Sequence, residues 1–207
     1  MRNLIYSTIK TISFLSFILV FNFSFAQNSP SKVNDFKCFI TSDIETSKNI
    51  LEFDLYLLDS DSSTPFELAS IQLGLLVNPA IYNDGDISVS FIDGSSELID
   101  AQKPSSMVFS QTSNIIKIAA RINNPVPGTV PPSTRGTIIS AKYPGTRVCR
   151  IRLTNTKSFN KIPAYISFNF TKFPYPTTIT QYISGINTAL LCNTSNCYYM
   201  EALDLLK

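Results

Sequence analysis

The stretch that decides the fold is LEFDLYL, residues 51–57. Apolar side chains occupy every second position, and Glu52, Asp54 and Tyr56 occupy the positions between them. A period of two places one set of side chains on each face of a β-strand, so one face of this segment is expected to be buried. The same alternation recurs in residues 71–77, 87–91, 116–122, 149–153 and 166–170. The sequence therefore predicts at least six half-buried strands.

Turn-forming residues separate these segments. Asn83-Asp84-Gly85, Asp93-Gly94 and Pro144-Gly145 are turn signals, because Asn and Gly tolerate positive φ and Pro fixes its own φ. Residues 123–136 contain four prolines and are expected to form a long exposed loop. Many short strands, polar turns and no helical period predict an all-β fold. We expect an antiparallel β-sandwich of the immunoglobulin-like or jelly-roll type.

The first 26 residues have the pattern of a signal peptide. Arg2 and Lys10 flank the start of an apolar run, residues 11–25, and Ser24-Phe25-Ala26 provides the small residues that a signal peptidase needs. This run is short for a bilayer of about 30 Å, and a retained N-terminal anchor is the alternative. No later apolar run is long enough to span a membrane, so we expect a secreted or cell-surface protein, with the periplasm as an alternative.

The domain boundaries follow from this assignment. We expect a signal peptide at 1–26, a single β-sandwich domain at 27–197 and a short tail at 198–207. The tail has helix-forming residues and little alternation, which indicates either a short terminal helix or the start of an element that the chain does not complete.

Removal of the signal peptide leaves a neutral chain with 15 basic and 15 acidic residues. Residues 27–102 hold 13 acidic and 3 basic side chains, whereas residues 103–207 hold 12 basic and 2 acidic ones. One interpretation is a dipolar surface. We favour the other, in which the two halves of a sandwich interleave and opposite charges meet on adjacent strands. The neutral total and the export signal argue against nucleic-acid binding.

The four cysteines are Cys38, Cys149, Cys192 and Cys197, an even number that favours disulfides in an exported chain. Cys192 and Cys197 enclose four polar residues that allow the chain to turn back, so we expect a disulfide between them. Cys38 and Cys149 lie on apolar faces of their segments, where they either bridge the sheets or remain buried thiols.

The composition argues against an enzyme. Histidine is absent, which removes the usual general base, the Ser-His-Asp arrangement and His-ligated zinc. Glu52 and Asp54 are compatible with a glycosidase carboxylate pair, but a solvated strand face is the simpler interpretation. The acidic loops 59–63 and 83–86 offer oxygen ligands for Ca²⁺ without the EF-hand pattern. We expect no catalytic residue, no metal and no cofactor.

Three aromatic residues are candidates for ligand binding. Phe173 falls on the outward phase after an alternating segment, and Pro174-Tyr175-Pro176 makes a rigid exposed stretch behind it. Tyr82 lies at a turn. Exposed aromatic rings stack on sugars or anchor protein partners, whereas a bulge would return Phe173 to the core. We expect Tyr82, Phe173 and Tyr175 to bind a polysaccharide or a surface protein.

One segment resembles a known family. Residues 69–81, ASIQLGLLVNPAI, form an alternating strand that ends in Asn78-Pro79 and Ile81. Pro79 stops the strand, the Asn78 side chain supports the turn, and Ile81 returns to the core. This strand and turn resemble those of cohesin modules and related carbohydrate-binding sandwiches. The resemblance, over residues 36–191, implies a cohesin-like sandwich that holds a carbohydrate or a protein.

The signal peptide adds a second resemblance. An ending in Phe-Ala-Gln before such a sandwich is similar to surface proteins of the type IX export route, which normally continue into a C-terminal sorting domain. This sequence stops at Lys207 without one, so we expect release by another path or a truncated coding region. The expected function is a secreted non-catalytic binding module. The alternatives are a glycoside hydrolase with paired carboxylates and a structural adhesin or spacer domain.

Overall fold

A computed structural model describes residues 35–119, 136–171, 173–183 and 186–200 of the chain, all within one compact unit. The predicted signal peptide, all of the predicted proline-rich loop except Gly136, and the last residues of the predicted tail lie outside the described residues. Within the described part, no helix is long and apolar enough to cross a membrane.

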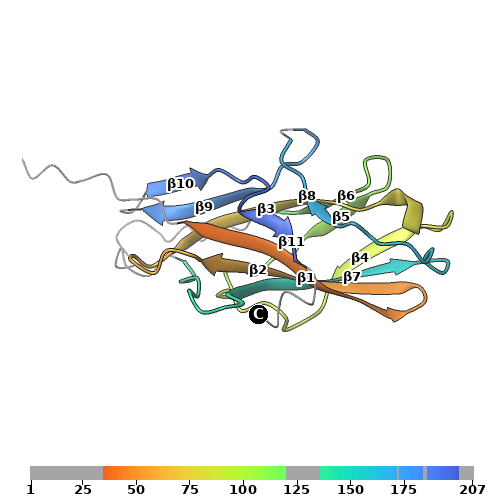
Figure 1. The fold of residues 1–207 in the computed structure, drawn as a ribbon, viewed down its shortest axis with the longest axis horizontal. Coiled ribbons are helices and arrows are strands. Elements are labelled where there is room, and N and C mark those ends of the chain that lie inside the picture. Colours follow the sequence, from red (N-terminus) through yellow and green to blue (C-terminus); the bar gives the residue numbers. More distant parts are fainter. Residues whose placement is uncertain (1–34, 120–135, 172, 184–185, 201–207) are drawn as a thin grey trace, which may run out of the picture. The chain divides into compact units, whose positions relative to one another are not determined.

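The described residues form two β-sheets (Figure 1). The first sheet has the strand order β11 (Cys197–Tyr199), β1 (Phe36–Ser47), β2 (Ile50–Asp59), β7 (Thr146–Asn155) and β4 (Ile87–Phe91). The second has the order β10 (Ile186–Leu190), β9 (Thr178–Ile183), β3 (Leu68–Leu76), β6 (Ile115–Ile118) and β5 (Met107–Ser110), and β8 (Ser167–Phe168) pairs with β3. All described pairings are antiparallel except that of β1 with β11.

The core lies between the inward faces of the two sheets. Phe53 and Leu55 of β2 and Leu73 and Leu75 of β3 are fully buried in one hydrophobic cluster. Ile151 of β7 belongs to the same cluster. Because each strand supplies alternate residues to this cluster, the period of two in the sequence becomes the inside and outside of a sandwich. The predicted all-β sandwich is confirmed.

The predicted end of the strand at Asn78 is confirmed in detail. The Asn78 side chain accepts a hydrogen bond from the backbone N–H of Ala80 at 3.1 Å. Pro79 begins a short 3-10 helix, Pro79–Ile81. Ile81 is 2% exposed and belongs to the core cluster. The turn therefore brings the chain back into the core immediately after β3, as the sequence predicts.

The sandwich extends beyond its predicted end at residue 197. Tyr198 and Tyr199 lie in β11, which pairs in parallel with β1 through Cys38↔Cys197 and its two neighbours. The prediction of a tail that starts at residue 198 is therefore corrected for these two residues. The pairing of β1 with β11 joins the two ends of the domain and has no local sequence signal. The alternation of apolar residues therefore could not predict β11.

Candidate functional site

The outer face of the first sheet carries charged side chains from β2 and β7. A bulge in β7 shifts the register between Leu55↔Cys149 and Tyr56↔Arg147, so Val148 is the extra residue. Val148 and Cys149 are both buried, and Arg147 and Arg150 on either side of them are only half-buried. A bulge of this kind re-aims the side chains around it. It explains how two arginines three residues apart share one face.

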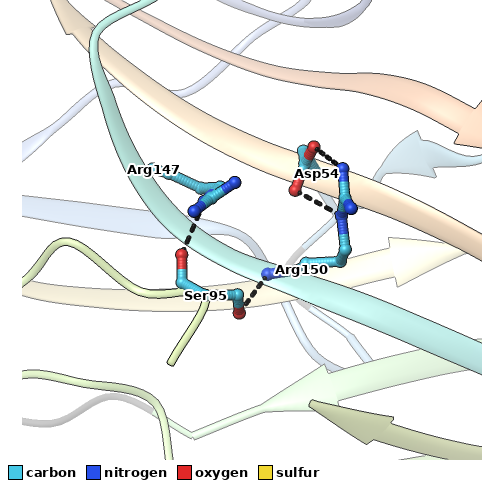
Figure 2. Close-up of polar contacts among 4 residues, drawn as sticks. All are labelled: Asp54, Ser95, Arg147 and Arg150. Atoms are coloured by element: carbon cyan, nitrogen blue, oxygen red, sulfur yellow. Dashed lines mark hydrogen bonds and ion pairs between the residues drawn. The ribbon is translucent and has the colours of Figure 1, made fainter. Parts of the chain in front are cut away.

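Asp54 and Arg150 form a two-pronged ion pair on this face (Figure 2). The Arg150 Nε donates to Oδ1 of Asp54 at 3.0 Å, and Nη2 donates to Oδ2 at 2.6 Å. The Asp54 side chain is only 4% exposed, so the pair is shielded from water on the carboxylate side. The hydrogen bond with Asp54 raises the pKa of Arg150 and keeps the guanidinium charged.

A second ion pair lies beside the first. The Arg152 Nε donates to Oε1 of Glu52 at 2.8 Å, and the two strands pair at Glu52↔Arg152 and Asp54↔Arg150. The acidic first half of the sequence and the basic second half thus meet on adjacent strands. The interleaving of opposite charges that we favoured is confirmed on this face.

Residues after β4 hold the bulge of β7 in place. Ser95 is central to this contact: its backbone oxygen accepts from Arg147 Nε at 2.6 Å, and its Oγ accepts from the Arg150 backbone N–H at 2.9 Å (Figure 2). Glu97 donates its backbone N–H to the Arg147 oxygen at 2.9 Å, and its carboxylate accepts the Arg147 N–H at 2.7 Å. The backbone groups that the bulge exposes are therefore satisfied by Ser95 and Glu97.

Aromatic rings continue this face toward β1 and β11. Phe39 is fully buried although it lies on the outer side of β1, because three tyrosines surround it. Its ring centroid lies 5.7 Å from that of Tyr56 and 6.2 Å from those of Tyr143 and Tyr198. We call Phe39, Tyr56, Tyr143 and Tyr198 the aromatic cluster. It buries Phe39 without a partner molecule.

The outer face of the first sheet is thus occupied by its own contacts. Glu52 and Asp54, the pair that would serve a glycosidase, are each tied to an arginine. Oxygens of both carboxylates are therefore engaged by guanidinium groups of the neighbouring strand. One exception to full pairing on this face is Thr41, opposite Asp54 in the ladder, whose buried Oγ1 lacks a hydrogen-bond partner.

The outer face of the second sheet carries a loop instead. The segment between β8 and β9, residues 169–171 and 173–177, stands out from the sandwich in Figure 1, and we call it the Phe173 loop. Both of its ends are bonded to Gly74. The Asn169 N–H donates to the Gly74 oxygen at 2.7 Å, and Thr177 Oγ1 donates to the same oxygen at 3.0 Å and accepts the Gly74 N–H at 3.3 Å.

Gly74 is required where the loop crosses β3. A Cβ added at Gly74 would lie 1.9 Å from the Tyr175 carbonyl oxygen, far inside van der Waals contact. An isolated glycine within a strand pattern indicates a close approach of another backbone. This signal was present in the sequence and was not used. Asn169 Nδ2 donates to the same Tyr175 oxygen at 2.8 Å, which closes the loop on itself.

Exposed apolar side chains lie on and beside the loop. Phe173 is 84% exposed. Val108 of β5, Lys117 of β6 and Gly74 of β3 occupy one row across the sheet, and Val108 is also exposed. Met107 and Phe109 pack against the core, so Val108 between them points to the outer face. Val108 and Lys117 therefore lie in the same row as Gly74, the residue to which the Phe173 loop is hydrogen-bonded.

The three predicted ligand-binding residues are not brought together. Phe173 and Tyr175 share the loop, but the Tyr175 hydroxyl donates to the Ile118 oxygen at 3.1 Å, so it holds the loop to β6. The expectation that Tyr82 is exposed is wrong. It is 6% exposed, its hydroxyl donates to the Val77 oxygen at 3.4 Å, and its ring meets Phe109 edge to face. Burial raises the pKa of Tyr82.

The cysteines are free thiols in this structure. A bridge between the sheets from Cys38 to Cys149 is contradicted, because both lie in the first sheet with β2 between them. Two strand spacings are about 10 Å, beyond the reach of a disulfide. The predicted Cys192–Cys197 disulfide is not formed in this structure, and the Cys192 thiol donates instead to the Leu190 oxygen at 3.9 Å.

Of the two acidic loops considered for Ca²⁺, residues 59–63 use carboxylate oxygens in hydrogen bonds within the protein. Asp59 accepts the N–H groups of Asp61 and Phe66 at 3.0 and 3.2 Å, and Asp61 accepts the N–H of Ser63 at 3.1 Å. Asn83 and Asp84 form a turn with positive φ, as expected of these residue types. No group of three potential ligands that could hold a metal ion occurs among the described residues.

No protein family matches the sequence, and no curated protein matches it. Solved structures similar to the chain include type II cohesin modules from Acetivibrio cellulolyticus. The second type II cohesin module of the cellulosomal adaptor ScaA scaffoldin is 9% identical with a TM-score of 0.45, and the match covers 82% of this chain and 95% of that one. A chain of the Coh3ScaB-XDoc_M1ScaA complex, a type II cohesin-X-dockerin complex, is 8% identical with a TM-score of 0.45. This match covers 81% of this chain and 96% of that one.

Proposed function

We propose that this chain is an exported, non-catalytic module that binds a protein partner through the Phe173 loop. The observation that carries the proposal is the combination of an aromatic ring that is 84% exposed with a loop whose ends are both bonded to Gly74. Large aromatic side chains are typical anchors of protein interfaces. Ordering a flexible loop on binding costs conformational entropy, which offsets part of the binding energy of an exposed ring. This loop is already held in place by its hydrogen bonds, so that cost is smaller.

The surroundings of the loop favour a protein over a glycan. Phe170 and Val108 are exposed apolar neighbours in the loop and on the adjacent strand row, and Lys117 adds a positive charge. Sugar sites combine a stacking ring with several polar groups that hydrogen-bond hydroxyls. The Tyr175 hydroxyl is engaged with the Ile118 oxygen, and the Thr171 hydroxyl donates to the Phe173 oxygen at 2.7 Å. We therefore infer that the partner offers an apolar pocket for Phe173 and an acidic group near Lys117.

The arrangement of the carboxylates supports a non-catalytic role in this proposal. Glu52 and Asp54 are ion-paired, and three surface hollows of the described residues contain one carboxylate each, from Glu45, Asp93 and Asp35. A glycosidase needs two carboxyl groups about 5–10 Å apart in one cleft.

The exported location in this proposal is supported by the sequence of residues 1–26, which has the charged start, apolar run and small-residue cleavage site of a signal peptide. We propose that the mature chain starts at Gln27 and acts at the cell surface or outside the cell. The similarity to proteins of the type IX route is tested by blocking that route and following the protein in the culture medium: its loss from the medium would support this route, and unchanged release would show that another path is used.

A site-specific crosslink tests the binding proposal. A photoreactive phenylalanine analogue is placed at position 173 and, as the control, at position 191, where Leu191 is also largely exposed. We expect a discrete protein adduct from surface extracts with the probe at 173 and none with the probe at 191. Phe173→Ala should weaken capture of that partner at least tenfold, and Leu191→Ala should leave it unchanged.

The other outcomes decide against the proposal. Binding on a glycan array that Phe173→Ala abolishes would identify a carbohydrate module. Hydrolysis of any glycan by the purified chain would identify an enzyme. Equal adducts from both probe positions would show that the Phe173 loop has no special role.

A further inference from the structure

Three of the four cysteines form a cluster where the first and last strands meet. Cys38 of β1 and Cys197 of β11 are direct partners in the parallel ladder, and both belong to the hydrophobic core. Cys192 precedes β11 and packs against that core. All three cysteines therefore lie in or against the core at the same edge of the first sheet.

The backbone places Cys197 near both Cys192 and Cys38. The segment before β11 turns through Asn193, whose oxygen accepts the N–H groups of Asn196 and Cys197 at 3.3 and 2.8 Å. This turn brings Cys192 back toward Cys197. The Cys38 N–H then donates to the Asn196 oxygen at 2.7 Å, which sets β11 beside β1.

We propose that Cys197 forms the structural disulfide of this domain with Cys38, and that Cys192 is the exchange partner through which this bond is reached. Neighbouring strands place paired Cα atoms about 4.8 Å apart, within the range that a disulfide spans. Cys38 and Cys197 are 0% and 2% exposed, so their bond is shielded from reductants, whereas Cys192 is partly exposed.

The chemistry proceeds in two balanced steps. A small-molecule disulfide such as oxidised glutathione oxidises the Cys192 and Cys197 thiols, which are close in sequence, and is itself reduced to two thiols. The Cys38 thiolate then attacks the Cys197 sulfur. The new Cys38–Cys197 bond forms as the Cys192–Cys197 bond breaks, and the released Cys192 sulfur takes up the proton that Cys38 lost.

The two disulfides should differ in how strongly they stabilise the fold, because they close loops of very different length. The Cys192–Cys197 bond closes a loop of about 6 residues, and the Cys38–Cys197 bond closes one of about 160 residues. In the chain-entropy account the longer loop restricts the unfolded chain more. Cys149 takes no part, because it lies beyond β2 in the same sheet, and burial raises the pKa of its thiol.

Disulfide mapping tests the proposal directly. The full chain is equilibrated with oxidised glutathione, alkylated and digested with trypsin without reduction. Cys38 then lies in the peptide 38–48, and Cys192 and Cys197 share the peptide 173–207. We expect a crosslink between these two peptides and free thiols at Cys149 and Cys192. The Cys192→Ser variant should reach the same crosslink at equilibrium but more slowly, because it lacks the exchange partner, and its melting temperature should fall by about 10 °C on reduction.

Two further variants separate the alternatives. Cys38→Ser should contain only the Cys192–Cys197 bond, with a smaller loss of melting temperature on reduction, and Cys149→Ser should behave as the wild type. A wild-type chain that keeps the Cys192–Cys197 bond and an alkylated Cys38 at equilibrium overturns the proposal. So does a chain in which all four cysteines stay alkylated after oxidation.

Discussion

The outer faces of the two sheets differ in what their outward side chains contact. On the first sheet, Asp54 and Glu52 meet arginines of the neighbouring strand, and Phe39 is covered by tyrosines of its own chain. On the second sheet, the Phe173 side chain is exposed to solvent. It extends from a loop that is hydrogen-bonded to Gly74. Charge and aromatic content alone therefore do not identify a binding face. On the first face the charged and aromatic side chains contact one another and stabilise the fold. On the second face the ring of Phe173 remains exposed.

The largest expected effect comes from the ion pair of the first face. Asp54→Ala removes the buried carboxylate and leaves Arg150 half-buried without its charge partner. We expect a loss of about 3 kcal/mol in the free energy of unfolding, measured by urea denaturation. Partner binding through the Phe173 loop should be unchanged.

The matched control is the neighbouring pair. Arg152 is 42% exposed, so Glu52→Gln should cost only about 1 kcal/mol. Equal losses in the two variants would show that burial does not set the strength of these pairs.

Gly74→Ala should have the next largest effect, on the second face. The added methyl group would meet the Tyr175 carbonyl oxygen and force the loop away from β3. We expect a loss of about 2 kcal/mol in unfolding free energy together with weaker partner capture. Ser70→Ala, on the same strand, is the control and should change neither quantity. An unchanged melting temperature in Gly74→Ala would mean that the loop is not held as the structure shows.

Tyr175→Phe should give a smaller change on the same face. It removes the hydroxyl that donates to the Ile118 oxygen, for an expected loss of about 1 kcal/mol. Tyr165→Phe, whose side chain is 71% exposed, should have no effect on unfolding. A loss of partner binding without any loss of stability in Tyr175→Phe would instead assign its hydroxyl to the interface.

The smallest expected effect is a dependence on alkaline pH. Burial raises the pKa of Tyr56 on the first face, with a further rise from Asp54, and burial also raises the pKa of Tyr175. A raised pKa means that the folded state holds the proton more tightly. The contribution is therefore complete below about pH 10, where the unfolded tyrosine titrates, and is lost as the pH rises through the folded value. Unfolding measured from pH 9 to pH 11 should show this decline, and Tyr175→Phe should reduce it.

The fold was predictable because its signal is local. Residues 51–57 carry the alternation that makes β2 half-buried, and Asn78 and Pro79 carry the chemistry that ends β3. β11 was missed because three residues paired in parallel with β1 have no period of their own to recognise. The extra residue in β7 was missed as well, since a bulge breaks the alternation by one position and leaves the rest of the strand intact.

The candidate site was predictable only in part. The exposure of Phe173 was predicted from the outward phase of its position and the prolines behind it, and its role in binding stays a prediction. Tyr82 was misassigned because a residue beside a turn can still point inward, and here its ring packs on Phe109. The role of Tyr175 depends on a hydrogen bond to a strand 57 residues away in sequence, which no local pattern contains.

The parallel pairing of β1 with β11 has a consequence for how the chain is made. A ribosome or an export channel that delivers the N-terminus first supplies β1 early and its partner β11 only after about 160 further residues have emerged. One edge of β1 keeps its backbone groups unpaired throughout that interval. The first sheet therefore stays incomplete until the residues of β11, up to Tyr199, have arrived.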